Sequence, residues 1–248
     1  MNYNILTPLK NEERYILQTI ESVLSQNKLP QEWVIIDDFS TDNSLSIIKK
    51  YANQYGFISV IESPKINQNE ISARIAYLVN YGCSKFKEPF DLFLKLDADV
   101  ILPIDYCSDL LSKFEENNKL GIASGCAKYK GIEEKNNDKN LTRGAAKFYR
   151  RDCFQQIGGA YISRGWDTMD NYAAHLSGWE TKKFDIYFNH IKKEGKKSGK
   201  IMLRYWTGLF NGRVPYYFPY FLLKILRYIF HEPIFIGSLI ELLGYINS

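Results

Sequence analysis

Cysteine and histidine are scarce in this sequence, with four and three copies among 248 residues. The cysteines stand far apart, form no Cys-x-x-Cys pair and have no histidine cluster near them: Cys83, Cys107, Cys126 and Cys153. This spacing argues against a disulfide scaffold and against a zinc site. We expect most of the cysteines to be small buried residues in a reducing compartment.

The sequence also lacks a strong net charge and internal repeats, and we expect no secretory signal. The formal charge of +4 is too small to predict nucleic-acid binding. No basic segment followed by an apolar one opens the chain, and no solenoid period or low-complexity tract occurs. With 45% hydrophobic residues the chain can bury a full core. We therefore expect a cytoplasmic protein of one domain with an appendage, and no nucleic-acid partner.

Short apolar runs alternate with segments of helical period through the first half of the chain. Strands are predicted at 3–6, 33–36, 57–61, 90–96 and 120–127, and helices at 12–25, 42–55, 70–81 and 104–117. This alternation is typical of an α/β fold with a mostly parallel sheet and helices on both faces. Ligands of such folds bind beyond the carboxyl ends of the strands.

Two carboxylates, Asp97 and Asp99, follow the apolar strand that ends at Leu96. Residues two apart in an extended backbone point to the same side, so both carboxylates can face one ion. Oxygen ligands suit Mg²⁺ or Mn²⁺, and such ions keep open positions for substrate phosphates. An isolated Asp-x-Asp is more often a solvated turn, so the metal site depends on the other motifs.

Polar residues also follow the first two predicted strands. Pro8 ends the first strand, within the segment 7–12, and Asp37 and Asp38 follow the second. Capping of the next helix accounts for the residues at 40–42 but not for the two aspartates. Adjacent carboxylates repel each other unless one accepts hydrogen bonds, which a base N–H or the hydroxyls of a ribose would donate.

A further carboxylate, Asp167, falls at the start of a predicted helix that ends at Leu176. An aspartate there is typical of an N-cap. It also meets the needs of a general base, because a helix start is exposed and rigid. Asp170 is the second candidate for this role. Trp166 and Trp179 offer flat apolar faces to a sugar acceptor, although tryptophans more often pack in a core.

Together these motifs resemble the inverting family 2 glycosyltransferases of the GT-A fold, over nearly all of residues 3–213. The resemblance implies a GT-A, Rossmann-like catalytic domain in residues 1–213 that binds a nucleoside diphosphate sugar, with UDP as the expected nucleotide. In this comparison Asp38 matches an aspartate that contacts the base. The nucleotide-binding residues that the resemblance implies are Thr7, Pro8, Leu9, Asn11, Glu12, Asp37, Asp38, Arg74, Asp97 and Ala98.

The resemblance also assigns the catalytic base, which matches Asp167. The sequence departs from the family pattern at two places. Trp166 stands where many members carry an acidic residue, and the segment 69–71 replaces a glycine that often precedes Arg74.

His190, as an isolated histidine, would more often be structural. It matches a histidine of the GT-A pattern that completes the metal shell, so the resemblance implies Mg²⁺ or Mn²⁺ held by Asp97, Asp99 and His190. The basic segment 192–200 follows. It is either a solvated charge run or a loop that covers a diphosphate or meets anionic lipid.

Aromatic and aliphatic side chains dominate the C-terminal segment, residues 214–248, which we expect to form a helical hairpin. Lys224, Arg227 and His231 are spaced three and four apart and would form one polar stripe. The apolar stretch 234–246 would be a helix of about 20 Å, too short for a hydrocarbon layer of about 30 Å. We expect an in-plane anchor at the inner face of the cell membrane. The alternatives are packing on the catalytic domain or a homodimer interface.

The sequence thus predicts a metal-dependent inverting glycosyltransferase that moves a sugar to a hydroxyl of a saccharide or lipid-linked saccharide in cell-surface glycan synthesis. One rival is a polyprenyl-phosphate sugar synthase of the same fold. Another is a non-enzymatic, membrane-bound assembly factor with a vestigial nucleotide fold. A nucleotidylyltransferase is disfavoured, because the segment 7–12 lacks the glycine-rich, arginine-containing turn that grips a nucleoside triphosphate.

Overall fold

The structure is a computed structural model, and it describes residues 1–65, 71–133, 138–163, 165–192, 200–213, 218–230 and 234–247. The chain forms two compact units, residues 1–192 and residues 193–248. The first unit contains the sheet and its covering helices, and the second contains the C-terminal helices.

The first unit is built on one mixed sheet in the order β3-β2-β1-β4-β8-β6-β9-β5, with β7 paired to β6. The strands are β1 (Tyr3–Leu9), β2 (Glu32–Asp37), β3 (Ile58–Glu62), β4 (Leu92–Leu96), β5 (Val100–Ile101), β6 (Leu120–Tyr129), β7 (Ile132–Glu133), β8 (Ala146–Arg150) and β9 (Glu180–His190). The four strands β3, β2, β1 and β4 are parallel neighbours. Beyond them β8 is antiparallel to both β4 and β6, while β9 is parallel to β6. The predicted α/β sheet is confirmed, with its parallel part in the first half of the chain.

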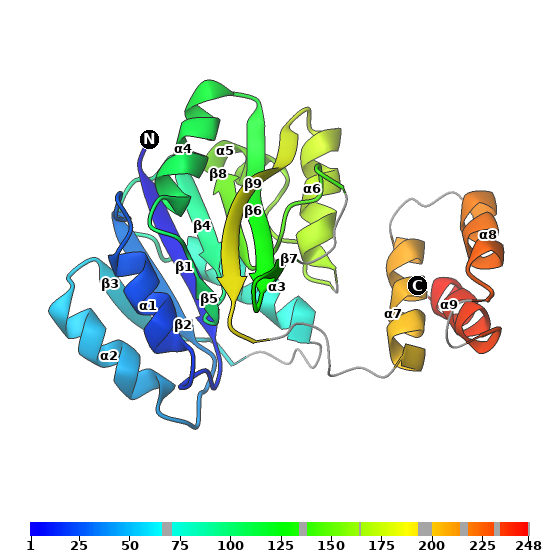
Figure 1. The fold of residues 1–248 in the computed structure, drawn as a ribbon, viewed down its shortest axis with the longest axis horizontal. Coiled ribbons are helices and arrows are strands. Elements are labelled where there is room, and N and C mark those ends of the chain that lie inside the picture. The colour runs from blue at the N-terminus through cyan, green and yellow to red at the C-terminus, as the bar shows by residue number, and fades with distance from the viewer. Residues whose placement is uncertain are drawn as a thin grey trace. The chain divides into compact units, whose positions relative to one another are not determined.

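Helices cover both faces of this sheet (Figure 1). One face is covered by α1 (Ile16–Leu24), α2 (Ser44–Gln54) and α4 (Tyr106–Glu116), and the other by α3 (Ile71–Cys83), α5 (Arg151–Gln156) and α6 (Trp166–Leu176). The buried apolar residues form one cluster on each face, and neighbours in β1 divide between them: Ile5 joins the first cluster and Leu6 the second. Burial on both faces explains why the central strands are continuous apolar runs.

All nine elements predicted for the first half of the chain are present, with ends that differ by a few residues. The largest difference is at α1, which begins at Ile16 because the backbone N–H of Tyr15 first closes a turn onto the carbonyl oxygen of Glu12 (2.9 Å). The end of β6 extends the sheet by a short antiparallel pair, since β6 runs on to Tyr129 and β7 pairs with it; residues 134–137 lie outside the described part.

The strand register sets where the site lies. Leu9 at the end of β1 pairs with Asp37 at the end of β2, and Leu6 pairs with Lys95 near the end of β4. The carboxyl ends of these parallel strands therefore meet at one edge of the sheet, where the residues that follow them come together.

The second unit contains α7 (Lys200–Arg213), α8 (Phe218–Arg227) and α9 (Ile236–Ile246). The sequence placed the boundary after residue 213, but the structure groups α7 with the later helices. A side chain on Gly208 of α7 would clash with the carbonyl oxygen of Glu241, and one on Gly244 with that of Tyr205. These two glycines let α7 and α9 pack backbone to backbone. None of the helices that the structure describes is long and apolar enough to cross a membrane.

Candidate functional site

Asp38, directly after β2, is held by Arg74 of α3. The Arg74 Nε donates to Asp38 Oδ2 (2.6 Å) and its Nη2 donates to Oδ1, while the Ser63 hydroxyl also donates to Oδ1 (2.8 Å). Asp38 is 4% exposed. Burial alone would raise the pKa of its carboxyl, but the hydrogen bonds from Arg74 and Ser63 and the positive charges of Arg74 and Lys10 lower the pKa below its ordinary value. Asp38 is therefore a fixed, ionised acceptor.

The loops after β1 and β2 are joined to each other by side-chain hydrogen bonds. Ser40 accepts from the backbone N–H of Asn11 (3.0 Å), and the Asn11 side chain accepts from the N–H of Thr41 (2.8 Å). Ser44 at the start of α2 accepts from the N–H of Glu12 (2.9 Å). Asn11 adopts a left-handed φ of 55°, which asparagine tolerates better than most residues. These hydrogen bonds join the two predicted nucleotide-binding loops into one surface after β1 and β2.

Other residues predicted to bind the nucleotide lie in the two strands that these loops follow. Thr7 is fully buried, and its hydroxyl accepts from the indole N–H of Trp33 (3.0 Å). Leu9 is buried, and its carbonyl oxygen accepts from the N–H of Asp38 (2.7 Å). Pro8, between them, is half-buried. Asp37 is buried as well, and its Oδ1 has no hydrogen-bond partner among the described residues. An unused buried acceptor favours a donor supplied from outside the chain.

The Asp-x-Asp motif places Asp99 among other charged groups. Asp99 lies near Asp97, His190, Glu12 and Lys192, and its backbone oxygen accepts from the N–H of Ile191 (3.0 Å). Burial, with the negative charges of Asp97 and Glu12, raises the pKa of the Asp99 carboxyl to about 6. The predicted pairing of Asp99 with His190 follows from the register, because His190 pairs with Val100 in β5. Acidic residues from distant parts of the chain meet here.

Lysines balance part of this negative charge. Lys95 donates to Asp97 Oδ1 and to the carbonyl oxygen of Gly144 (2.9 Å), and Lys192 donates to Glu12 Oε1 (3.0 Å). The other carboxylate oxygen of Glu12 is buried without a partner in the described part of the chain. Ala98 is buried, and its carbonyl oxygen accepts from the Thr19 hydroxyl (2.8 Å), which anchors the turn between the two aspartates.

The expected metal ligands are only partly assembled. Within the described residues, no group of three or more histidine, cysteine, aspartate or glutamate side chains has the arrangement to hold a metal ion. Asp99 and His190 lie close together, whereas Asp97 is paired with Lys95. The donors nevertheless fit a hard divalent cation in kind. Carboxylate oxygens are the ligands it prefers, and a cation would relieve the repulsion that raises the pKa of Asp99.

Asp167 and Asp170, the two candidate bases, differ sharply in their surroundings. Asp170 is 2% exposed and pairs with Lys147 (Nζ to Oδ1 3.0 Å, to Oδ2 3.1 Å) and with the hydroxyl of Tyr149. Asp167 is half-buried in the first turn of α6, and its carboxylate packs against Gly144. Of the two, Asp167 is the one that is partly exposed, whereas Asp170 is buried in an ion pair.

The segment before β8 brings Asp167 beside the Asp-x-Asp motif. The N–H of Asp97 donates to the carbonyl oxygen of Ala145 (2.8 Å), and Gly144, the preceding residue, contacts the Asp167 carboxylate. Asp38, Asp97 and Asp167 thus lie along the same edge of the sheet.

Trp166 lies next to Asp167 but is buried, whereas Trp179 lies at the opposite end of β9. Trp166 is 4% exposed and packs in the core, with Lys95 Nζ 5.7 Å from its ring centroid. Trp179 precedes β9, whereas His190 ends it, so the two are separated by the length of the strand, roughly 30 Å. Trp179 instead donates to Gln156 (2.8 Å) and packs against the apolar core. Both tryptophans therefore pack against the apolar core, which is the more common environment of tryptophan.

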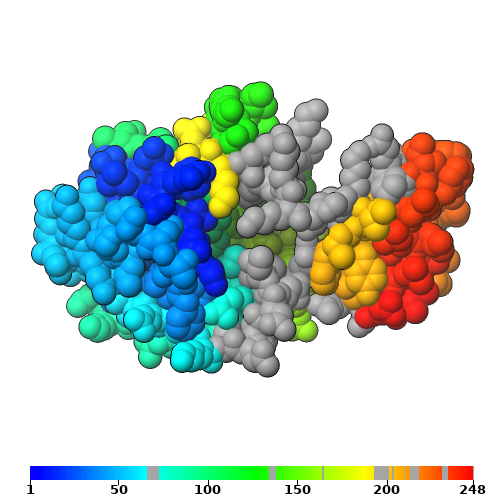
Figure 2. All heavy atoms as spheres, turned by 90° about the horizontal axis from the view of Figure 1, so that it is seen from below, coloured from blue at the N-terminus to red at the C-terminus, as the bar shows by residue number. Residues whose placement is uncertain are grey.

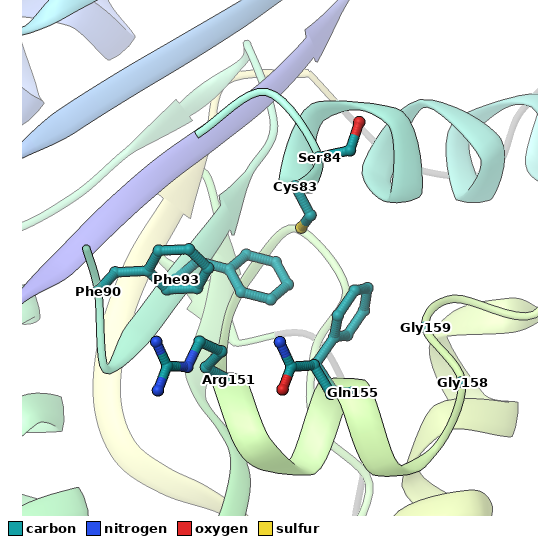
Figure 3. A pocket seen from close by; sticks show the side chains of 9 residues that line it. Cys83, Ser84, Phe90, Phe93, Arg151, Gln155, Gly158 and Gly159 are labelled. Atoms are coloured by element: carbon teal, nitrogen blue, oxygen red, sulfur yellow. The ribbon is translucent and has the colours of Figure 1, made fainter. Parts of the chain in front are cut away.

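A cavity of about 300 Å³ lies at the opposite end of β4 (Figure 3). Phe90, Phe93 and Phe154 line it, and the figure shows Arg151 and Gln155 of α5 beside them. None of the described residues that line it carries a carboxylate, so this cavity is separate from the acidic edge, the edge of the sheet where Asp38, Asp99 and Asp167 lie.

Four contributors to the site were not predicted from the sequence. Ser63 and Lys95 each hold a predicted aspartate, Lys147 donates to the backbone oxygen of Asp167 (2.5 Å), and Gly144 leaves room for the Asp167 carboxylate. Ser63 follows β3 directly, so its place at the same edge was a usable signal. Lys95 stands two residues before Asp97, so that contact is local as well, whereas Lys147 and Gly144 reach Asp167 from a distant segment, which no local pattern encodes.

The chain is similar to known proteins in sequence and in structure. In sequence, the chain is 29% identical over 115 residues to poly-beta-1,6-N-acetyl-D-glucosamine synthase of Staphylococcus epidermidis, a match that covers 46% of this chain and 26% of that enzyme. The chain thus spans about a quarter of this relative's length. In structure, it is similar to S. aureus TarS 1–349 in complex with UDP-GlcNAc (TM-score 0.65, 17% identity, 86% of this chain and 66% of that chain). It is also similar to the mannosyltransferase PcManGT of Pyrobaculum calidifontis in complex with GDP-Man and Mn²⁺ (TM-score 0.66, 15% identity, 100% and 75%).

Both structural likenesses confirm the GT-A-like fold. The family model described as Glycosyl transferase family 2 matches residues 4–170, two thirds of the chain. That range runs from β1 to the first turns of α6 and includes Asp38, Asp99 and Asp167. The chain belongs to glycosyl transferase family 2.

Proposed function

We propose that this protein is a metal-dependent inverting glycosyltransferase that moves a sugar from a UDP-linked donor to a hydroxyl of a saccharide or lipid-linked saccharide. The observation that carries the proposal is the edge of the sheet where the Asp38–Arg74 pair, the Asp97–Asp99 motif and an accessible Asp167 lie together. The names of the relatives support it: one is a polysaccharide synthase, and TarS is seen with UDP-GlcNAc.

Asp37 and Asp38 would recognise the nucleotide. Each carboxylate oxygen accepts about two hydrogen bonds. Oδ1 of Asp38 already has two, from Ser63 and Arg74, whereas Oδ2 has one, from Arg74 Nε. One acceptor position on Asp38 and the unpartnered Oδ1 of Asp37 are left for N–H or O–H donors of a base and a ribose.

Asp99 and His190 would hold Mn²⁺ or Mg²⁺ next to the diphosphate. Asp97 would join them if its carboxylate released Lys95 and bound the ion instead. PcManGT, a structural neighbour, is seen with Mn²⁺. Such an ion neutralises the charge that develops on a departing diphosphate. Lys192, whose ammonium group lies near Asp99, would add a second positive charge at the same place.

Asp167 would act as the general base. As the acceptor oxygen attacks the anomeric carbon opposite the diphosphate, its proton passes to the Asp167 carboxylate. The bond between the anomeric carbon and the diphosphate oxygen breaks, and the diphosphate leaves with the electron pair. Attack from the opposite side inverts the anomeric configuration.

A polyprenyl-phosphate acceptor would need no such base, because a phosphate is already ionised. The accessible Asp167 carboxylate therefore favours a hydroxyl acceptor over this rival. Incubation of the donor with a polyprenyl phosphate as the only acceptor separates the two: a sugar-linked product would support the rival. A non-enzymatic assembly factor would bind UDP without hydrolysis or transfer.

A screen of nucleotide sugars for hydrolysis, with Mn²⁺, with Mg²⁺ and with a chelator, tests the proposal. We expect slow hydrolysis of a UDP-sugar that the chelator abolishes. Asp167→Asn should lower turnover about a hundredfold or more and leave UDP affinity nearly unchanged. Asp152→Asn is the matched control, because Asp152 is an exposed aspartate in the first turn of α5. Unchanged turnover in Asp167→Asn would remove Asp167 from this role.

A further inference from the structure

In helix α9 the polar and small residues face inward and the large apolar residues face outward, the reverse of a helix in a soluble domain. Its buried residues are small or polar, namely Gly237, Ser238, Glu241 and Gly244. Its exposed residues include large aliphatic ones spaced three and four apart: Ile236 (55% exposed), Leu239 (59%), Leu243 (48%) and Ile246 (68%). This spacing puts them on one face of the helix. An apolar stripe therefore points away from the core of its own unit.

Charged groups occupy the interior instead. Glu241 is 2% exposed and lies between three helices: it pairs with Arg204 of α7 (2.9 Å) and with Lys224 of α8 (3.1 Å), and it accepts from Asn211 of α7 (3.4 Å). A buried charge is expensive unless it is paired. The two ion pairs and the hydrogen bond offset the loss of hydration of the Glu241 carboxylate. They also fix which side of α9 faces inward.

Helix α8 repeats the pattern. Its buried residues are Phe221 and Ile225, and Phe221 stacks on Tyr245 with ring centroids 4.1 Å apart. Tyr220 (61% exposed), Leu223 (65%) and Leu226 (61%) lie on another face, and Phe230 (73%) follows the helix. Of the polar stripe predicted from the sequence, Lys224 pairs with Glu241 and Arg227 is exposed. His231 lies outside the described residues.

The charge of the chain is concentrated in the same unit. Residues 193–248 contain eight lysine and arginine residues against three aspartate and glutamate residues, a net charge of +5. The other 192 residues contain 24 basic and 25 acidic residues, a net charge of −1. The unit that carries the exposed apolar side chains (orange to red in Figure 2) thus also carries the net positive charge of the sequence, and Arg227 of α8 is an exposed basic residue on it.

We propose that the outward apolar stripes of α8 and α9 dock on an anionic lipid bilayer and that α8 and α9 lie in its interface. At 1.5 Å per residue α8 and α9 are about 15 Å and 17 Å long, half of a hydrocarbon layer of about 30 Å. Aliphatic and aromatic residues of an interfacial helix enter the acyl boundary, and lysines and arginines attract anionic headgroups.

Charge complementarity favours lipid over a second copy of the chain as the occupant. Two copies that met through these helices would bring two units of charge +5 together, which is repulsive. An anionic bilayer offers the opposite charge and an apolar phase at once. The proposal does not depend on the enzymatic reaction.

Co-sedimentation of the full chain with vesicles tests the proposal. We expect the wild-type protein to sediment with vesicles of phosphatidylcholine and phosphatidylglycerol, and to bind pure phosphatidylcholine more weakly. Salt should weaken the binding to the anionic vesicles. The variant Leu239→Glu with Leu243→Glu should lose affinity by about tenfold for each substitution, because each removes apolar surface from the lipid and adds a negative charge.

Leu176→Glu is the matched control, because Leu176 is an 86% exposed leucine at the end of a helix in the first unit. It should bind vesicles like the wild type. Far-UV circular dichroism shows whether each variant folds. If the α9 double variant does not fold, the α8 double variant Leu223→Glu with Leu226→Glu takes its place. Wild-type protein that stays in solution, or variants that sediment unchanged, would overturn the proposal. So would a lipid-free dimer that the variants dissociate, because the occupant would then be a second copy.

Discussion

Arg74 and Asp38 are 36 residues apart in the sequence and meet through two hydrogen bonds, one to each carboxylate oxygen. Arg74 belongs to α3, on one face of the sheet, and Asp38 follows β2 at its edge. The pair ties a covering helix to the loop that would hold the nucleotide. Two-point contacts of this kind fix orientation as well as charge.

Arg74→Met should therefore weaken both folding and UDP binding. Asp38 would remain buried with less compensation, at a cost of about 2 kcal/mol in the free energy of unfolding. Because the pair lowers the pKa of Asp38, its contribution is present at neutral pH and is lost as pH falls below the unfolded pKa near 3.9. Urea denaturation at pH 7 measures the loss. Lys10→Met removes an exposed ammonium 3.9 Å from the same carboxylate and should cost less than about 0.5 kcal/mol. Equal losses in the two variants would contradict this account.

Breaking the buried pair of Lys147 and Asp170 should destabilise the protein strongly. Both side chains are fully buried, and Lys147 Nζ is 3.0 Å from Asp170 Oδ1. Lys147→Met leaves a carboxylate unpaired inside the protein and should lower the free energy of unfolding by about 3–5 kcal/mol. Asp170→Asn in the same background removes the unpaired charge and should recover part of the loss. A double variant that is no more stable than Lys147→Met would argue against an ion pair as the cause.

Gly144 should control the position of the proposed base. A Cβ at this residue would lie 2.6 Å from Asp167 Oδ2, so Gly144→Ala forces the carboxylate to move. We expect kcat to fall about tenfold with little change in UDP affinity, since misplaced catalytic groups act on the chemical step. Gly56→Ala is the control, because a Cβ there has no neighbour within 4 Å. If Gly144→Ala raised KM for the donor and left kcat unchanged, the contact would serve binding rather than catalysis.

Metal affinity should depend on pH through Asp99. Its pKa is raised to about 6 by burial and by neighbouring carboxylates, and a protonated carboxyl is a poor ligand. Apparent Mn²⁺ affinity should therefore fall by up to tenfold for each pH unit below about 6 and level off above it. Electron paramagnetic resonance of free Mn²⁺ at several pH values measures this. The same affinity at every pH from 5 to 7 would rule out Asp99 as the group that titrates.

Much of the edge could be predicted from the sequence because it is encoded locally. Buried parallel strands are continuous apolar runs, so their ends are visible, and Asp37, Asp38, Asp97 and Asp99 stand at those ends. The meeting of His190 with Asp99 was expected from family resemblance alone, and the β5–β9 pairing accounts for it.

Strands β8 and β9 were not predicted, because buried lysines interrupt their apolar pattern. Lys147 in β8 is fully buried and Lys183 in β9 is 7% exposed, so both strands look solvent-exposed in the sequence. The partners that permit such burial, among them Asp170 for Lys147, come from other elements. The start of the second unit at residue 193 was not predicted for a similar reason. The contacts of Gly208 and Gly244 that join α7 to α9 depend on helix packing, which the local sequence does not encode.

Titration calorimetry of UDP, with and without Mn²⁺, tests the central claim most directly. We expect Mn²⁺ to tighten UDP binding at least about tenfold, because an ion held by Asp99 and His190 would neutralise part of the charge of the diphosphate. Asp99→Asn should abolish that gain, and Asp38→Asn should weaken UDP binding under both conditions. UDP affinity that is the same with and without Mn²⁺ and in both variants would contradict a nucleotide site at this edge of the sheet.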